Sequence, residues 1–211
     1  MDQVVRSKLN RKPDRGSNGN EDIYPILDAT FLCHVAFVLD GEARVLPTAF
    51  VRLGDAIYLH GHLRNQMLNT LLNGQVVCVT VTLLDGLVLA RSGFHHSVNY
   101  RSAVVYGQAE AVAAQDKNTV LNALIDHMVP GRSGAIREAT EQELNATLVI
   151  KIPIREASAK SRRGPPIDAG ADLELDVWAG VVNQQTIVSG IDDCPQLKAG
   201  IERPPHVLAL K

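Results

Sequence analysis

Cysteines, aromatic residues and long apolar runs are all scarce in this sequence. The three cysteines, Cys33, Cys78 and Cys194, form an odd and scattered set, which argues against a disulfide framework. No apolar stretch reaches the roughly 18 residues needed to span a bilayer, and the polar first residues lack the apolar core of a secretory signal. The net charge of -2 gives no general affinity for nucleic acid or anionic membranes. We therefore expect a cytoplasmic protein with neither a membrane nor nucleic acid as a partner.

Short β-rich segments separated by turn signals dominate the middle of the chain. The expected strands cover residues 31–39, 43–51, 56–61, 75–84, 87–94, 100–112 and 146–152. Asp40-Gly41 and Asp85-Gly86 are hairpin signals. Pro47 predicts an edge or a bulge in its strand, because proline cannot donate to a β-ladder. The pattern predicts a mainly β protein with flanking helices, in which six to seven antiparallel strands form a closed or split barrel.

The chain divides into three parts by composition. Hydrophobic residues make up 45% of the sequence, enough for the core of one domain. Residues 1–19 are polar and end in a Gly-Ser-Asn-Gly run, so we expect a flexible N-terminal arm. Residues 20–155 hold the expected strands and form the barrel domain. Residues 156–211 are charged and proline-containing, and we expect an extension that packs on the barrel or on a dimer partner.

Three polar segments carry more functional groups than packing requires. In Tyr58–Met67 a strand ends in glycine and leads into a helix, whose free amides and positive dipole end suit a phosphate. His60 and His62 point to the same side of that strand, and Arg64 adds a donor. The second segment, Arg91–Ser102, holds two histidines, two aromatic residues and two arginines, as a concave site for an anionic ligand would. In the third, Leu46–Ala49, the proline leaves main-chain groups free for the edge of a planar polar ring.

Read in order, these segments resemble a known family. The run from His60 to Gly107, with Val-Thr-Leu-Leu-Asp-Gly-Leu-Val-Leu-Ala-Arg-Ser and Phe-His-His-Ser-Val-Asn-Tyr-Arg-Ser within it, carries most of the resemblance. It is similar to the flavin-nucleotide-binding, nitroimidazole-resistance-type branch of the pyridoxamine 5'-phosphate oxidase-like proteins. The resemblance implies an FMN-binding split barrel that works as a homodimer, with FMN at the subunit interface. The pyridoxamine-phosphate-binding residues of the true oxidases are not recognisable, so vitamin B6 synthesis is not expected.

The resemblance also assigns roles to individual residues. The expected flavin-binding residues are Pro47, Thr48 and Ala49 facing the ring, His60, Gly61 and His62 beside it, Arg64, Asn65 and Gln66 over the phosphate, Tyr100, Arg101 and Ser102 on the opposite strand, and Trp178 near the ring. Relatives often carry Ser-x-Lys or Ser-Arg where this chain has Asn65-Gln66. The positive charge for the phosphate is therefore expected from Arg64 and Arg101.

The expected activity is reduction of a small organic acceptor, nitroaromatic or quinone-like, with electrons from a nicotinamide. His60 is the expected proton donor to the substrate, because imidazole titrates near neutral pH. Two alternatives stay open: a flavin-binding or storage protein without turnover, and a barrel that uses haem or a deazaflavin instead. The histidines also admit plainer interpretations, either backbone-bonded strand ends or a zinc set completed by His95 and His96, although no cysteine or carboxylate joins that set and no metal is expected.

Overall fold

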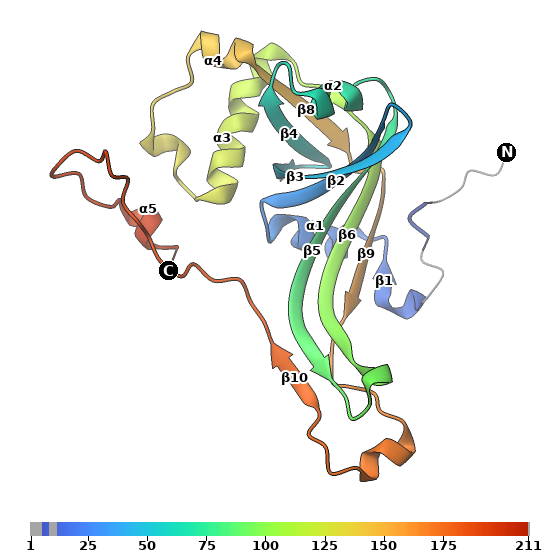
Figure 1. Ribbon diagram of the computed structural model, residues 1–211. Coiled ribbons are helices and arrows are strands. Elements are labelled where there is room, and N and C mark those ends of the chain that lie inside the picture. The colour runs from blue at the N-terminus through green and yellow to red at the C-terminus, as the bar shows by residue number, and fades with distance from the viewer. Residues whose placement is uncertain (1–5, 9–11, 211) are drawn as a thin grey trace.

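The computed structural model describes residues 6–8 and 12–210, and its strands form one antiparallel sheet that curls into a half-barrel (Figure 1). The strands are β1 Gly16–Ser17, β2 Leu32–Leu39, β3 Glu42–Leu53, β4 Ala56–His62, β5 Val76–Leu89, β6 Ser97–Gln108, β7 Glu110–Ala111, β8 Thr147–Pro153, β9 Glu156–Arg162 and β10 Gly180–Asn183. The helices are α1 Asn20–Asp28, α2 Gln66–Leu71, α3 Lys117–Met128, α4 Glu141–Ala146 and α5 Pro205–Leu208. The predicted class, mainly β with flanking helices, is confirmed.

The sheet curls back on itself because the chain passes from β6, inside the strand order, almost directly into β7 at its end. The strand order is β1-β9-β6-β5-β2-β3-β4-β8-β7, and β10 pairs with β5 outside this path. β7 follows β6 directly in the chain, yet it pairs with β8 at the far end of the order. The path therefore returns to its own middle, which leaves few unpaired edges and encloses a core.

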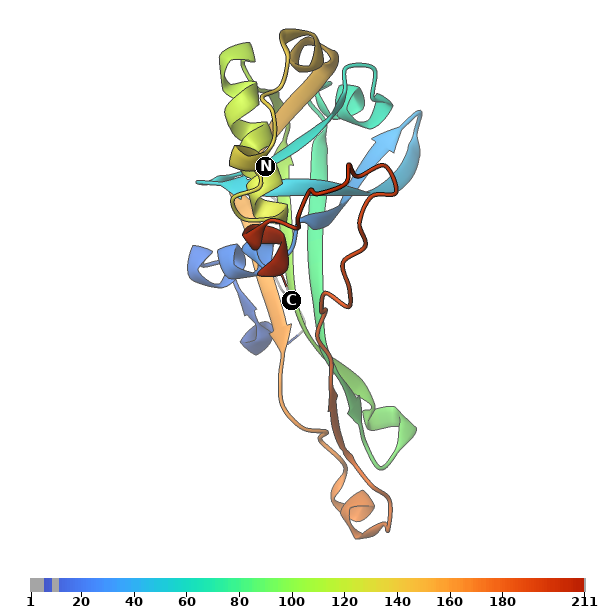
Figure 2. The same ribbon diagram turned by 90° about the vertical axis from the view of Figure 1, so that its left-hand side faces the viewer.

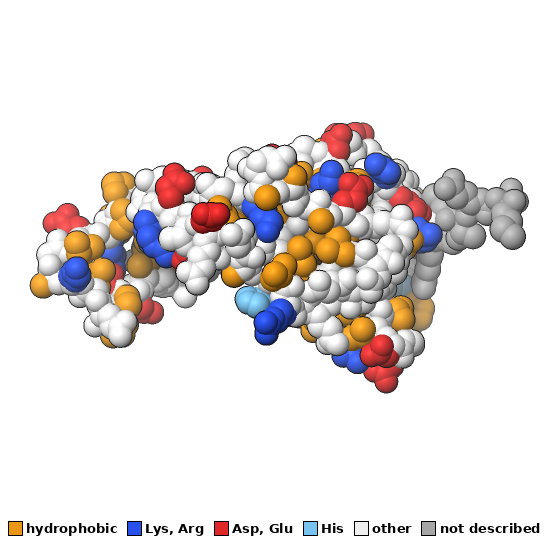
Figure 3. Space-filling view, turned by 90° about the horizontal axis from the view of Figure 1, so that it is seen from above, with side chains coloured by type: hydrophobic (Ala, Val, Ile, Leu, Met, Phe, Trp, Pro, Cys, Tyr) orange, Lys and Arg blue, Asp and Glu red, His pale blue; other side chains and the backbone are white. Residues whose placement is uncertain are grey.

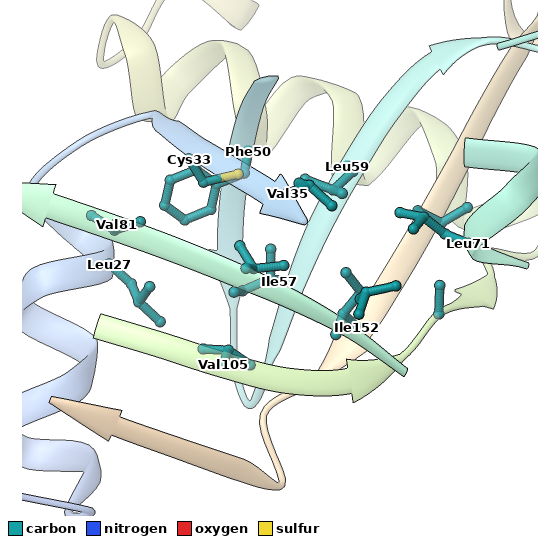
Figure 4. Close-up of a cluster of buried hydrophobic side chains, with 14 of the residues drawn as sticks. Leu27, Cys33, Val35, Phe50, Ile57, Leu59, Leu71, Val81, Val105 and Ile152 are labelled. Atoms are coloured by element: carbon teal, nitrogen blue, oxygen red, sulfur yellow. The ribbon is translucent and has the colours of Figure 1, made fainter. Parts of the chain in front are cut away.

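The core lies inside the curl and is filled by alternate residues of the strands. Val35, Ile57, Leu59 and Val105 are fully buried there (Figure 4). Helix α1 adds Leu27 to the same cluster and contacts β3, β5, β6 and β9. Side chains that alternate with these buried residues point to the opposite face of the sheet, which we call the outer face.

Helix α3 covers only part of the outer face. Val120 and Leu124 of α3 form a second apolar cluster with Val51 of β3 and Val149 of β8. On β2, β5, β6 and the first half of β3, the outer face is exposed or half-buried within the described residues. Helix α2 lies against β2, and the apolar residues of α1 join the core instead. This uncovered region is where the candidate site lies.

Two sequence expectations about strands were wrong. Asp85-Gly86 does not turn the chain: β5 runs unbroken from Val76 to Leu89, with a β-bulge between Leu84 and Gly86. A strand was also missed, since β9 pairs with β6 and makes residues 156–162 part of the barrel. Its sequence, Glu-Ala-Ser-Ala-Lys-Ser-Arg, has no β-branched or aromatic residue, so the usual strand signal is absent.

Both ends of the described chain depart from the expected division. Gly16 and Ser17 pair with β9, so the sheet begins inside the segment expected to be a flexible arm. Arg6 makes an ion pair of 3.1 Å with Glu156. Residues 1–5 and 9–11 of the expected arm lie outside the described residues. At the other end, the chain after β10 leaves the body and runs beside it as an extended segment, as both ribbon views show (Figures 1 and 2).

Candidate functional site

Several predicted residues meet on the outer face of the sheet. Ser102 of β6 lies opposite Thr82 of β5, and on its other side opposite Lys160 of β9. Ala49 of β3 lies opposite Leu32 of β2. These pairs follow from the strand register, which fixes which side chains share a face.

The same register brings His60 into line with these residues. His60 of β4 lies opposite Val149 of β8, on the outer face. The pairing of β3 with β4 begins at Phe50 opposite Leu59, so one further step along both strands sets Ala49 beside His60. Three residues predicted from three separate segments, Ala49, His60 and Ser102, therefore lie along one row that crosses the sheet, which we call the outer row.

His60 is the outer-row residue whose surroundings are most unusual. Its imidazole is half-buried, and its Nδ1 atom is buried with no hydrogen-bond partner among the described residues. Desolvation by burial lowers the pKa of His60 below its ordinary value. A neutral imidazole with an unpaired buried nitrogen can form a hydrogen bond with a bound ligand or exchange a proton with it.

At the turn from β4 into α2, which the sequence predicts as a phosphate site, several donors already have partners within the chain. Asn65 is the N-cap of α2, and its Oδ1 accepts from the amide of Leu68 at 3.0 Å. The amide of Arg64 donates to His62 Nδ1 at 3.1 Å, and the amide of Asn65 donates to His62 O at 2.8 Å. Three main-chain donors of this turn are thus already used within the chain, although the side chains of Arg64 and Gln66 remain exposed.

Arg101 also differs from its expected place. It alternates with Tyr100 and Ser102 along β6, so its side chain points away from the outer row. Its guanidinium forms an ion pair of 2.7 Å with Asp85 and lines a hollow beside α1. The structure therefore does not bring Arg101 together with Arg64, which lies at the other side of the barrel before α2.

The proline-containing strand has the form that its sequence predicted. Residues 42–49 of β3 pair only with β2, so Pro47 faces a side without a ladder neighbour. Pro47 lies opposite His34 on the outer face and is exposed. Thr48 points the other way, and its carbonyl oxygen accepts from the buried thiol of Cys33 at 3.6 Å. Gly61 is where β4 passes close to α2, since a Cβ there would lie 3.0 Å from Leu68 Cδ1.

Trp178 lies apart from the outer row. It is 67% exposed and lies two residues before β10. Strand β10 pairs with the end of β5 in the lower part of Figure 1, away from the barrel. Phe94 is also highly exposed, at the turn between β5 and β6. Both aromatic side chains are largely exposed, with the Trp178 ring beside Gly180 and the Phe94 ring in edge contact with His95.

Sequence reasoning missed the outer-face residues that have no distinctive motif. They are Leu32, His34, Thr80, Thr82 and Lys160. Each is an ordinary strand residue in its own segment, and only the pairing of β2, β5, β6 and β9 brings them together. The one available signal was the polar alternation within Val-Thr-Val-Thr of β5. In the described ranges, no three histidine, cysteine or carboxylate side chains gather as a metal site would require.

Within the described residues, no helix has both the length and the apolar character needed to cross a membrane. The neighbours of known structure are similar over nearly the whole chain. The flavocytochrome Anf3 of Azotobacter vinelandii is 34% identical, with a TM-score of 0.92, over 98% of this chain and 96% of that one. The FAD and heme binding protein of Mycobacterium smegmatis is 37% identical, with a TM-score of 0.89, over 93% and 97%.

A more distant structure supports the fold alone. A Bacteroides thetaiotaomicron protein named for 5-nitroimidazole antibiotic resistance is 22% identical, with a TM-score of 0.58, over 69% of this chain and 85% of that one. Among curated proteins, none matches this chain. The family described as pyridoxamine 5'-phosphate oxidase matches residues 19–161, which include the barrel and the outer row. The chain belongs to this family, as its sequence motifs indicated.

Proposed function

We propose that this protein is a flavin-binding redox protein that also binds haem and works as a homodimer. The observation that carries the proposal is the outer row, where His60, with its unpaired buried nitrogen, lies in line with Ala49 and Ser102 on an uncovered face. The two neighbours at 34% and 37% identity, a flavocytochrome and a FAD and heme binding protein, support the choice of cofactors.

The residues present fit a planar, partly polar ring. Ala49 leaves room above the sheet, and Pro47 leaves main-chain groups on its free side unpaired for the ring edge. The hydroxyls of Ser102 and Thr82 supply further hydrogen-bonding groups on the same row. A flavin supplies hydride and single-electron transfer, while the protein binds and orients it.

FAD is proposed in place of the FMN expected from the sequence, because the 37% identical neighbour is named as an FAD and heme binding protein. The turn before α2 does not distinguish the two flavins, since FAD carries the same ribityl phosphate within its diphosphate.

Haem binding would need an exposed histidine whose imidazole can serve as the axial ligand of the iron. His34 and His62 are exposed on the outer face, whereas His60 is half-buried. The Nδ1 atom of His62 accepts a hydrogen bond from the amide of Arg64, so its other nitrogen carries the proton in this arrangement. We therefore propose His34 as the iron ligand and His62 as the alternative to be compared with it.

His60 is proposed as the residue that passes a proton to the reduced substrate. Its low pKa keeps the imidazole neutral at pH 7, so it must take a proton from solvent before it donates one. The proposed electron donor is a nicotinamide and the proposed acceptor a quinone-like or nitroaromatic compound. A binding or storage protein would hold the same cofactors without this turnover.

The proposed homodimer follows from the uncovered outer face. Leu32, Val38, Val45 and Leu84 point from this face and are 36% or more exposed. Exposed apolar patches of this kind mark interaction sites. A second copy that covers the outer face would bring the two flavin sites to the subunit interface and shield them from water.

The deciding experiment is the absorption spectrum of the purified protein before and after incubation with FAD and haem and desalting. Flavin bands together with a haem Soret band are expected, and mass spectrometry of the released flavin distinguishes FAD from FMN. His34→Ala should lose the Soret band and keep the flavin bands, with His62→Ala as the matched comparison. A protein that stays colourless after both additions would refute the proposal.

Turnover is tested separately from binding. NADH oxidation with a soluble quinone is measured in the wild type and in His60→Ala, at equal flavin content. A slower rate with flavin retained supports the proton-transfer role of His60. Full occupancy with no turnover in the wild type would identify a binding or storage protein instead.

A further inference from the structure

The described chain exposes far more surface than a compact monomer of its size. Its accessible surface is 13578 Å² at a mass of 22.9 kDa. A compact monomer of this mass is expected to expose about 9,600 Å². The surplus of roughly 4,000 Å² is well above the about 800 Å² that each partner buries in a standard interface, and it suits an obligate homodimer.

The segment after β10, residues 184–210, is mostly exposed, and we call it the C-terminal arm. At its start, the amide of Gln184 donates to Asp85 O of the body at 3.0 Å. Further along, described hydrogen bonds and ion pairs join residues of the arm to one another, including Arg203 with Asp193 at 2.8 Å. The arm is therefore ordered by its own turns rather than by the barrel.

The arm carries large apolar side chains that stay exposed in the described part of the chain. These exposed residues are Ile187, Val188, Leu197, Ile201 and Leu208. Ile187 is 67% exposed and Ile201 is 58% exposed. The space-filling view shows hydrophobic side chains along the arm at the left, well separated from those over the barrel (Figure 3). Exposed apolar side chains on an extended segment are typical of a surface that contacts another molecule.

The outer face of the sheet offers such a surface. Among the described residues, Leu32, Val38 and Val45 are exposed on β2 and β3. The arm also starts beside this face, because residues 183–187 and Leu84 of β5 line one hollow. The arm thus leaves the sheet near the outer face, and its later residues extend away from the barrel (Figures 1 and 2).

We infer that the C-terminal arm packs on the outer face of a second copy of this chain. Each arm would cross from its own β10 and lay its apolar side chains over β2 and β3 of the other subunit. The partner's arm would then close the flavin site at the outer row. This inference rests on the homodimer proposed above, but it adds which segment makes the contact and which surface receives it.

Apolar contacts of the arm are tested by charge insertion in the full-length chain. Ile187→Asp with Ile201→Asp should raise the dimer dissociation constant at least tenfold, measured by analytical ultracentrifugation, because apolar anchors dominate interface energetics. Gln185→Asp with Gln196→Asp introduces the same two charges into the arm without removing an apolar side chain and serves as the control. An unchanged dissociation constant in the double variant would overturn the inference.

Cys194 tests whether the contact is between chains. It is exposed on the arm, while Cys33 is buried and Cys78 is half-buried. With Cys78→Ser in both chains, Cys194 carries a benzophenone label in one chain, and the other, distinguished by a tag, has Cys194→Ser. Photo-crosslinks from the label to residues 32–49 of the tagged chain are expected. Crosslinks confined to the labelled chain would show that the arm folds back on its own barrel, and would refute the inference.

Flavin retention separates this inference from the function on which it rests. If the wild type is a monomer that still holds flavin, the homodimer and the arm contact both fail, while the flavin proposal stands. If the wild type is a dimer without any flavin, the arm inference is judged by the crosslinks alone. A dimer whose crosslinks fall outside residues 32–49 of the other chain would overturn the assigned surface.

Discussion

The guanidinium of Arg101 donates to both carboxylate oxygens of Asp85, from Nε at 2.9 Å and from a terminal nitrogen at 2.7 Å. This pair spans β6 and the bulge of β5. The carbonyl oxygen of Asp85 accepts from the amide of Gln184, so the same residue holds the base of the C-terminal arm. Arg101 therefore stabilises the junction of three segments in the described structure.

Replacing Asp85 by Asn should lower the free energy of unfolding by about 1 kcal/mol at pH 7, because the pair is bidentate but partly exposed. The hydrogen bonds from Arg101 lower the pKa of Asp85. The stabilisation is therefore present above the ordinary carboxyl pKa of about 4 and is lost as the pH falls through the lowered value. Urea unfolding at several pH values measures the gap between wild type and variant.

The control for that prediction is Glu42→Gln. Glu42 pairs with Arg44 at 3.3 Å on a more exposed surface, where ion pairs contribute little. A loss of stability as large as that of Asp85→Asn, or a gap that does not shrink at low pH, would contradict the role given to Asp85.

Gly86→Ala should loosen β10. A Cβ at Gly86 would lie 3.0 Å from Val182 O and 3.1 Å from Val181 Cγ1, so the paired strand must shift. We expect a loss of about 1 kcal/mol and faster hydrogen exchange at the β10 amides. Gly93→Ala is the matched control, because its Cβ would meet nothing within 4 Å. Equal exchange rates in both variants would show that the close approach at Gly86 carries no energy.

His60 should titrate below the ordinary imidazole pKa of about 6.5, because burial disfavours its charged form. The unfolded chain then binds more protons than the folded chain as the pH drops below that value, so stability should fall with pH in this range. NMR titration of the His60 ring gives the pKa, and His60→Gln should flatten the pH dependence of unfolding. A midpoint at or above 6.5 would mean that the ring is not desolvated.

Ala49→Phe should abolish flavin retention while leaving the barrel folded. The added ring would occupy the space over the outer row, where the flavin is proposed to lie. Ala43→Phe is the control. Ala43 lies on the same face of β3, six residues before Ala49, and is exposed. Absorbance after desalting measures the flavin, and circular dichroism checks the fold. Normal retention in Ala49→Phe would move the flavin site away from this row.

The sequence predicted well wherever a local signal decided the outcome. Asp40 and Gly41 both adopt positive φ, 54° and 81°, as their hairpin turn requires. Thr140 and Glu143, three residues apart, form the capping box of α4. The Asp-Gly signal failed at Asp85-Gly86. There β5 stays paired with β6, and the extra residue forms a β-bulge instead of a turn.

By itself, then, the sequence determined the strands with strong β propensity, their turns and caps, and the family, because each of these depends on neighbouring residues or on a recognisable run. Only the tertiary structure decided that β9 completes the barrel, that Ala49, His60 and Ser102 share a row, and that Arg101 points away from it. Those outcomes depend on register between strands far apart in the chain. A shift of one residue would reverse every side chain, and no local pattern records that choice.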